Sequence, residues 1–350
     1  MDEQERTLDI GSSPHLLSGA SVDAIMRQVI YALLPVMAFA IYSYGLAAIA
    51  ILTTAIVSCV LTEHILCRIN RLPSTAHDGS ALITGILYGL ILPPALPLWM
   101  VAAGGVICIA LGKFLFGGLG GNGFNPALVG RAFLQAAFPA SMTTWLPAFS
   151  TQRFHELPAS LLTAPFMTPN YAFISTDSVS SATPLSAFKF DGALTDNLHL
   201  FLGLTQGSLG ETSSLVIILC GIYLIVRRMM NWRIPAGIFL AVILLSALFH
   251  HLDATHYAGP LFMLFSGGLM LGAMFMATDP VASPITNSGC FIYGALIGAL
   301  VVIIRNWGGL PEGVMYAILF CNALSPHIDR LLQPRVFGSR SGKSRHEVEP

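Results

Sequence analysis

Long apolar runs, separated by short polar stretches, occupy most of this sequence. Many of these runs approach the roughly 20 residues that an α-helix needs to cross a bilayer. Only 10% of the residues are charged, whereas soluble domains carry about 25%. A chain within lipid has to satisfy its backbone hydrogen bonds internally, and helices do so segment by segment. The sequence therefore predicts an all-α polytopic membrane protein. Its net charge of −1 gives no basic excess for binding nucleic acid.

The apolar runs predict about ten membrane-spanning helices. The third span is interrupted by Pro93, Pro94 and Pro97, and the fifth extends only from Asn125 to Pro139. The fifth would cover roughly 22 Å at 1.5 Å per residue. We therefore expect both to be half-helices or re-entrant segments buried in protein. The ten predicted spans are 27–44, 45–66, 80–96, 97–116, 125–140, 212–228, 234–251, 257–277, 289–306 and 312–332.

Lysine and arginine residues are distributed unequally between the predicted loops. If the N-terminus is cytoplasmic, thirteen lie on the cytoplasmic side, three lie on the outer side and Arg131 lies within a span. Because basic loops favour the cytoplasm, we expect both termini in the cytoplasm and residues 141–211 outside it. The thirteen are Arg6, Arg27, Arg68, Arg71, Lys113, Arg227, Arg228, Arg233, Arg330, Arg335, Arg340, Lys343 and Arg345, and the three are Arg153, Lys189 and Arg305.

The chain divides into two membrane blocks with one long polar interval between them. A weak echo between residues 77–85 and 278–286, each followed by a glycine-rich span, favours a duplication. Two units of five spans would be inverted relative to one another, as in many transporters. The expected regions are a cytoplasmic N-terminal segment (1–26), a first membrane repeat (27–140), an extracytoplasmic insert (141–211), a second membrane repeat (212–332) and a basic cytoplasmic tail (333–350).

The cysteines and histidines form no pattern typical of a metal centre. Five of the six cysteines lie inside apolar runs, Cys67 lies at the end of a span, and no CxxC pair occurs. This pattern argues against a disulfide framework or an iron–sulfur cluster held by this chain. Residues 250–256 contain enough ligand types for zinc, but they lie in a short predicted loop where polar residues are expected anyway. We therefore predict no metal site.

A hydroxyl-rich run at 175–185 lies within the polar interval and ends in Thr183-Pro184-Leu185. A residue before proline is held in an extended backbone, because proline disfavours the α region for its predecessor. The small residues Ser180, Ser181 and Ala182 would leave the Thr183 hydroxyl accessible to a modifying enzyme. Composition alone predicts only a loop here.

The same run, placed between two membrane blocks of this size, resembles the covalent-flavin site of the RnfD/NqrB family. These are membrane subunits of the Rnf (Rsx) electron-transport complex and of the Na⁺-translocating quinone reductase. The resemblance covers essentially the whole chain, whose length and single insert are more similar to RnfD. The family often has glycine where this chain has Ser178 and Ser181, a change between small residues. The matching motif residues are Asp177, Ser180, Ser181, Ala182 and Thr183.

The resemblance implies that FMN is joined by its phosphate to the Thr183 hydroxyl, and that a separate flavin transferase attaches it. A protein that holds a flavin sets its potential through hydrogen bonds and burial. A second, non-covalent flavin (riboflavin) between the helices is a further expectation. The resemblance also implies an inner-membrane location in a bacterium.

Two further stretches contain candidate flavin or ion contacts. The glycine-rich residues 117–126 precede the fifth span and could present backbone N–H groups to an anion or a flavin edge, or could form a plain turn with close helix packing. The segment 277–284 resembles the family's Thr-Asp-Pro segment, in which Asp279 could contact a flavin, coordinate an ion or cap a helix. The candidate residues are Asn122, Asn125, Arg131, Thr278 and Asp279.

Two charged residues inside predicted spans need partners. A charge within an apolar helix is rarely left unpaired. For Arg131 we consider a flavin phosphate or a buried carboxylate. For Glu63, at the end of the second span, we consider an interfacial pair with Arg68 or Arg71, or a role in an ion or proton path.

By the resemblance, the chain is a membrane subunit of an ion-translocating oxidoreductase, not catalytic on its own, which carries electrons through FMN. The implied partners are the other Rnf subunits, especially the extracytoplasmic flavoprotein subunit, together with the flavin transferase and membrane lipid. Two alternatives remain open. One is a cofactor-free transporter or channel, which the interrupted spans fit equally well. The other is an NqrB-type quinone reductase subunit, which would need a quinone pocket.

Overall fold

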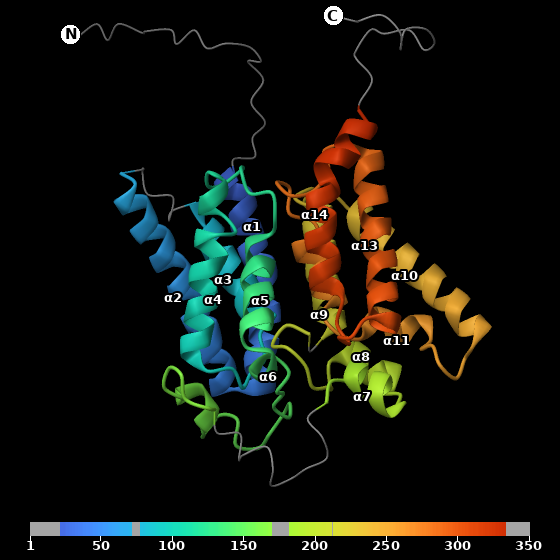
Figure 1. The fold of residues 1–350 in the computed structure, drawn as a ribbon, viewed down its shortest axis with the longest axis horizontal. Coiled ribbons are helices and arrows are strands. Elements are labelled where there is room, and N and C mark those ends of the chain that lie inside the picture. Colours follow the sequence, from blue (N-terminus) through green and yellow to red (C-terminus); the bar gives the residue numbers. More distant parts are fainter. Residues whose placement is uncertain (1–21, 72–77, 170–181, 212, 334–350) are drawn as a thin grey trace, which may run out of the picture.

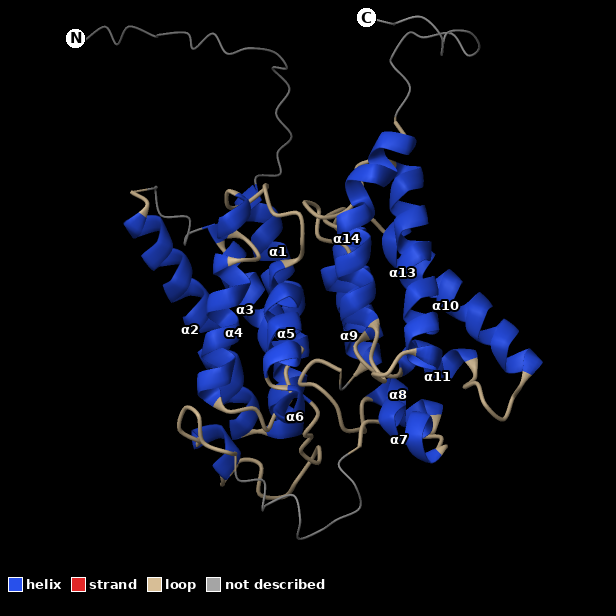
Figure 2. Ribbon diagram, in the orientation of Figure 1, coloured by secondary structure: helices blue, strands red, loops and turns tan. Residues whose placement is uncertain are grey.

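The computed structural model describes residues 22–71, 78–169, 182–211 and 213–333. Within these residues every regular element is a helix, and no strand occurs (Figure 2). The helices form two groups, and the described residues 138–169 and 182–211 lie at one end of them (Figure 1). The all-α polytopic fold is therefore confirmed.

The first group contains α1 (Val22–Tyr44), α2 (Leu46–Ile69), α3 (Ser80–Leu90), α4 (Leu98–Ala110) and α5 (Pro126–Ala137). Successive helices alternate in direction, because Lys113 after α4 contacts both Glu63 near the end of α2 and Ser80 at the start of α3. We call the end where α1 begins the terminal face, and the end that carries residues 138–169 and 182–211 the insert face.

The second group contains α9 (Ser214–Val226), α10 (Arg233–Leu252), α11 (Pro260–Phe265), α12 (Leu269–Leu271), the π-helical η5 (Gly272–Met276), α13 (Asn287–Trp307) and α14 (Val314–Leu331). The helix α9 starts at the insert face and ends at the terminal face, where the Tyr223 hydroxyl bonds Gln28 of α1. The helix α14 also ends at the terminal face (Figure 1). The two groups thus begin on opposite faces.

If α11, α12 and η5 are counted together as one interrupted span, the second span of each group packs along the fourth, as α2 with α4 and α10 with α13. Glycine allows the closest approach: a Cβ at Gly294 of α13 would lie 2.3 Å from the Ile234 carbonyl oxygen of α10. Membrane helices commonly meet through such small residues, since lipid supplies no hydrophobic driving force between them.

The third span is interrupted in both groups. In the first group α3 ends at Leu90, before Pro93 and Pro94, as the sequence predicts. In the second group the predicted span 257–277 is not continuous, because residues 266–268 separate α11 from α12. This second break corrects our prediction, and its cause is local: Gly267 has a φ of 65°, which a side chain would disfavour.

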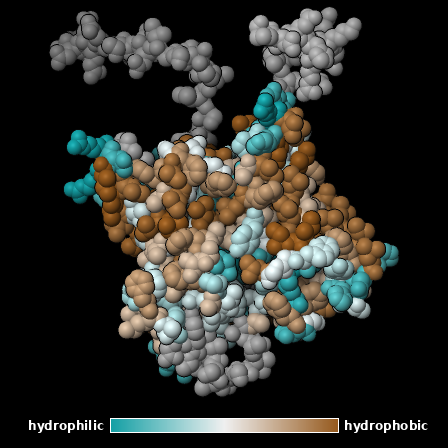
Figure 3. All heavy atoms as spheres, in the orientation of Figure 1, coloured by the Kyte–Doolittle hydropathy of each residue, from teal (hydrophilic) through white to brown (hydrophobic). Residues whose placement is uncertain are grey.

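Five described helices are long and apolar enough to cross a membrane, and α3 and α9 are shorter apolar helices. The predicted fifth span is also short, since α5 has 12 residues. Between α5 and α9 lie α6 (Pro139–Met142), α7 (Pro184–Asp191) and α8 (Asn197–Leu202). In the space-filling view a broad apolar band crosses the middle of the visible face, and hydrophilic residues gather at the insert face (Figure 3).

Candidate functional site

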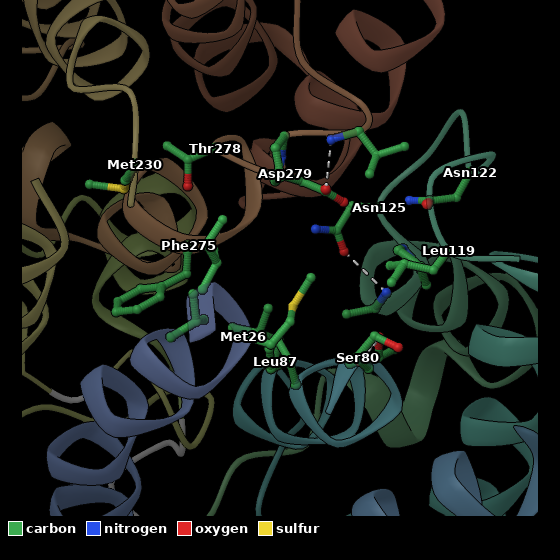
Figure 4. A pocket seen from close by; sticks show the side chains of 18 of the residues that line it. Met26, Ser80, Leu87, Leu119, Asn122, Asn125, Met230, Phe275, Thr278 and Asp279 are labelled. Atoms are coloured by element: carbon green, nitrogen blue, oxygen red, sulfur yellow. Dashed lines mark hydrogen bonds between the residues drawn. The ribbon is translucent and has the colours of Figure 1, made fainter. Parts of the chain in front are cut away.

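A cavity opens between the two groups at the terminal face (Figure 4). Apolar side chains from both groups form most of its wall, among them Met26, Leu87 and Phe275. Polar groups reach it from three places: the start of α3, the loop before α5 and the turn after η5. These polar lining residues are Ser80, Thr84, Lys113, Asn122, Asn125, Thr278 and Asp279.

Asn125 joins the two groups at this cavity. Its Oδ1 accepts from the N–H groups of Ala127 (3.1 Å) and Leu128 (3.4 Å), so it is the N-cap of α5. The following Pro126 needs no N–H at the first helical position, which makes Asn-Pro a natural helix start. The Asn125 Nδ2 donates to the Met276 carbonyl at 3.2 Å. One side chain thereby starts α5 and holds the end of η5.

Asp279 lies where the chain leaves η5. Its Oδ1 accepts from the Val281 N–H at 3.1 Å and forms a turn. It does not cap the next helix, because α13 is capped instead by Thr286. Burial raises the pKa of the Asp279 carboxyl to about 6, while hydrogen bonds from Val281 and the Asn122 amide act to lower it. A carboxyl with this pKa can change its charge near neutral pH.

Thr278 uses its hydroxyl within the helix, donating to the Met274 carbonyl at 2.7 Å. A π-helical turn often marks a functional position, since it displaces the side chains that follow it. Here η5 turns Thr278 and Asp279 toward the cavity (Figure 4).

The glycine-rich loop supplies Leu119 and Asn122 to the same cavity. Gly117, Gly118 and Gly120 all have positive φ, and a Cβ at any of them would meet no described residue within 4 Å. These glycines therefore serve the backbone conformation and do not permit close helix packing. Close helix packing through these three glycines is therefore wrong, while a contact between this loop and a flavin or an anion stays a prediction.

Lys113 forms a buried ion pair at the edge of the cavity. Its Nζ donates to both carboxylate oxygens of Glu63 (2.7 and 2.9 Å) and to Ser80 Oγ (2.6 Å). The expectation that Glu63 pairs with Arg68 or Arg71 is wrong. Glu63 faces inward from α2 and therefore pairs with Lys113, which follows α4.

Arg131, in contrast to the other candidates, does not line the cavity. Its guanidinium pairs with Glu312, and its Nη1 lies 3.9 Å from Glu211 Oε1. Between the two partners considered for Arg131, the structure supports the buried carboxylate. Arg305 lies close by and donates from Nη2 to the Ser266 carbonyl at 2.8 Å and from Nη1 to the Met263 carbonyl. We call Arg131, Glu211, Arg305 and Glu312 the four-charge cluster.

Thr183 is the N-cap of α7, and its Oγ1 accepts from the Ser186 N–H at 3.2 Å. Its backbone is extended, with φ −64° and ψ 153°, as its place before proline predicts. The expected accessibility of its hydroxyl is wrong, since Thr183 is only 4% exposed. The cause is that the side chain turns onto its own helix, which packs against the second group. Asp177, Ser180 and Ser181 lie outside the described residues.

A hollow beside Thr183 is lined by Ala182, Ala187, Thr195 and Gln206, among others. The Gln206 Oε1 is buried and has no hydrogen-bond partner within the described part of the chain. Lys189 holds α7 in place from its other end, where Nζ donates to the carbonyls of Arg305 (2.9 Å), Gly308 and Leu310 (3.2 Å).

The histidine-rich loop near residue 253 forms ordinary local contacts. His250 Nδ1 lies 2.7 Å from the Tyr257 carbonyl, and His256 lies 3.7 Å from the Asp253 carboxylate. Among the residues that the structure describes, no three potential metal ligands of the types His, Cys, Asp or Glu come together.

Sequence reasoning missed Lys113, Glu211 and Glu312 as members of buried ion pairs. The two glutamates stand at the borders of apolar runs, in Leu209-Gly210-Glu211 and Leu310-Pro311-Glu312. Such positions are usually assigned to solvated loops. Their only sequence signal is Arg131, a cation inside a predicted span that requires a carboxylate from another part of the chain.

Comparison with known proteins gives consistent matches over nearly the whole chain. Residues 9–338 match the family described as NQR2, RnfD, RnfE. The chain is 42% identical over 337 residues to the D subunit of the ion-translocating oxidoreductase complex of Stutzerimonas stutzeri, a match that covers 91% of this chain and 93% of that protein. It is 39% identical over 341 residues to the D subunit of the proton-translocating ferredoxin:NAD(+) oxidoreductase complex of Clostridium ljungdahlii, covering 95% and 96%.

A third relative differs in the ion that its name gives. This is the D subunit of the Na(+)-translocating ferredoxin:NAD(+) oxidoreductase complex of Acetobacterium woodii, which is 39% identical over 340 residues, covering 95% of this chain and 96% of that protein. Relatives at the same level of identity are thus named for protons and for sodium ions.

Proposed function

Because the chain belongs to the NQR2, RnfD, RnfE family, we propose that it is the D subunit of an ion-translocating oxidoreductase complex and carries electrons through FMN esterified to Thr183. The relatives are named as D subunits of such complexes and align over more than nine tenths of this chain. The chain is a membrane subunit and does not complete the reaction alone. Its partners are the other subunits of that complex.

The observation that carries the FMN proposal is the position of Thr183 as N-cap of α7. A phosphate on this hydroxyl would lie at a helix N-terminus, where free N–H groups and the helix dipole favour an anion. At the other end of α7, Lys189 donates hydrogen bonds to the carbonyls of Gly308 and Leu310. These bonds hold α7, and with it Thr183, in a fixed position. A rigid attachment keeps an electron carrier at a constant distance from its donor and acceptor.

The buried hydroxyl has a consequence for maturation. An enzyme cannot reach a side chain that is 4% exposed and hydrogen-bonded to its own helix. We therefore expect the flavin transferase to act before α7 packs against the second group.

The cavity at the terminal face suits a second, non-covalent flavin. A ligand site of this kind is mainly apolar and has a few convergent polar groups. Met26, Leu87 and Phe275 would contact the ring faces, and the Asp279 carboxylate would accept from a ring N–H. When bound, a flavin supplies one-electron chemistry, and the protein tunes it by hydrogen bonding and burial.

The charge distribution favours a cytoplasmic terminal face. Among the described residues, Arg27, Arg68, Arg71, Lys113, Arg227, Arg228, Arg233 and Arg330 lie toward this face. Arg153, Lys189 and Arg305 lie toward the insert face. By the positive-inside rule, α7 and Thr183 would lie outside the cytoplasm of a bacterial inner membrane, where an extracytoplasmic flavoprotein subunit could exchange electrons with them.

The test is in-gel flavin fluorescence after co-expression with a flavin transferase. We expect a fluorescent band for the wild type that survives denaturation, and its loss in Thr183→Ala. Thr195→Ala is the matched control, since Thr195 lines the same hollow without capping α7. A dark wild-type band would overturn the FMN proposal and favour a cofactor-free transporter. A fluorescent Thr183→Ala band would overturn the assignment of the flavin to Thr183.

A further inference from the structure

The four-charge cluster brings two carboxyl groups together at one place. Glu211 and Glu312 share Arg131, and both reach Gly268: its N–H donates to Glu312 Oε1 at 3.2 Å, and a Cβ on Gly268 would lie 3.0 Å from Glu211 Oε1. Two ionised carboxylates placed in this way can only accept and repel each other, whereas a proton on one of them allows it to donate to the other. Such a shared proton is the usual result when two buried carboxyl groups lie this close.

The other contacts of the two carboxyl groups indicate which of them would hold a shared proton. Arg131 Nη2 pairs directly with Glu312, which also accepts from the Gly268 N–H at 3.2 Å. Glu211 is 3.9 Å from Arg131, and the Ser208 hydroxyl and N–H donate to it at 2.8 and 3.2 Å. The direct cation stabilises the charge on Glu312. A proton shared by the pair would therefore reside on Glu211, from which it could be donated to Glu312.

A crevice at the insert face reaches one member of this pair, Glu312. Its wall includes Arg131, Gln135, Thr143, Trp145, Glu312 and Tyr316. The Glu312 side chain is 19% exposed, whereas that of Glu211 is 4% exposed. A proton from water in the crevice would thus meet Glu312 first and then pass to Glu211.

The cluster is also connected to the breaks in both third spans. Glu312 and Arg305 bind the backbone at Gly268 and Ser266, in the break of the second group. The segment that ends at Glu211 donates from Leu209 and Gly210 to the carbonyls of Leu92 and Leu90, in the break of the first group. Two polar groups at this junction, Ser266 Oγ and Arg305 Nε, are buried without a hydrogen-bond partner among the described residues.

We propose that Glu211 and Glu312 form a proton-binding site that is open to the insert face and holds one exchangeable proton. On binding, an O–H bond forms on a carboxylate oxygen and donates to the other carboxylate. On release, the proton passes to water in the crevice. The charges that face the pair are Arg131 of α5 and Arg305 of α13. Tyr44 of α1 and Tyr316 of α14 also lie near the cluster. With both guanidinium groups charged, the bound proton changes the cluster from neutral to +1.

The experiment is infrared difference spectroscopy of the purified complex between two pH values, in H₂O and in D₂O. The wild type should give a carboxylic-acid carbonyl band that titrates with pH and shifts in D₂O. The band should be lost in both Glu211→Gln and Glu312→Gln. Glu63→Gln is the matched control, because Glu63 is equally buried but forms its ion pair with Lys113. The control should retain the band.

A band that persists in both cluster variants would overturn the proposal. So would a band that disappears when Na⁺ is added at constant pH, because a metal cation would then occupy the site. A second measurement remains informative if a variant is unstable. Glu211→Gln imitates the protonated side chain and leaves the Arg131–Glu312 pair intact, so it should retain more assembled complex than Glu312→Gln. Equal losses of assembled complex in the two variants would contradict the assignment of the proton to Glu211 and of the negative charge to Glu312.

Discussion

Two sets of buried charged side chains lie toward opposite faces of the protein. They differ in the number of carboxyl groups that share a cation. Toward the terminal face one cation, Lys113, meets one carboxylate, Glu63, within the first group of helices. Toward the insert face Arg131 meets two carboxyl groups, Glu211 and Glu312, where the two groups of helices join, and Arg305 binds the backbone beside them. The Lys113–Glu63 pair joins the ends of α4 and α2 to the start of α3, with one positive charge matched to one negative charge. The four-charge cluster can bind and release a proton, because its two carboxyl groups lie together at Arg131 and Gly268.

The largest expected effect is on the Lys113–Glu63 pair. Lys113→Met leaves Glu63 as a buried charge without its cation, which typically costs about 3–5 kcal/mol. The unfolding free energy in mixtures of mild detergent and dodecyl sulfate measures this loss. Adding Glu63→Gln to Lys113→Met should recover most of it, since both charges are then gone. No recovery in the double variant would mean that Lys113 acts through packing.

Arg131→Met should cost less than Lys113→Met, near about 3 kcal/mol, the lower end of the same range. After this change a proton on Glu211 removes one negative charge, and Arg305 remains close to Glu312. The same unfolding measurement compares the two variants. If Arg131→Met lowers the unfolding free energy more than Lys113→Met does, then Glu211 does not take up a proton to offset the lost cation. The proposed difference between the two sets of charges would then be wrong.

The cavity should bind a flavin in a pH-dependent way. The Asp279 carboxyl has its pKa raised to about 6, so it is ionised above this pH and protonated below it. A hydrogen bond to a charged group contributes about 1.5–3 kcal/mol, and a ring N–H donates more strongly to the ionised carboxylate than to the neutral acid. We therefore expect riboflavin to bind roughly tenfold more tightly above pH 6 than below it.

Quenching of riboflavin fluorescence on either side of pH 6 measures this affinity. Asp279→Asn is the control, because an amide does not titrate and the affinity should become independent of pH. A wild-type affinity that does not change with pH would remove Asp279 from the site.

The smallest expected effect concerns the cap of α7. In protein without covalent flavin, Thr183→Ala should destabilise α7 by about 1 kcal/mol, because the Ser186 N–H loses its acceptor. Hydrogen exchange of peptides from α7 should then be about fivefold faster. Thr183→Ser keeps the acceptor and should exchange like the wild type. Unchanged exchange in Thr183→Ala would show that Lys189 alone holds the helix.

Much of the candidate site could be predicted from local sequence. Asn125-Pro126 specifies a helix start, Thr183-Pro184 specifies an extended capping residue, and the prolines after Leu90 end α3. Four of the five candidate contacts, Asn122, Asn125, Thr278 and Asp279, line one cavity. The placement of Arg131 away from it could not be predicted, since its partner Glu312 is 181 residues distant.

The sequence by itself determined that the chain forms apolar helices in two blocks, because run length, proline positions and basic loops act over a few residues or through the bilayer. Only the tertiary structure decided which buried charges meet. Lys113 reaches Glu63 because α4 returns to the end of α2. Glu211 comes close to Glu312 because residues 209–211 lie between the two broken spans, against Leu90 and Leu271. A buried charge needs a partner, but its own neighbours in the sequence do not identify that partner, since the packing of distant segments brings the two together.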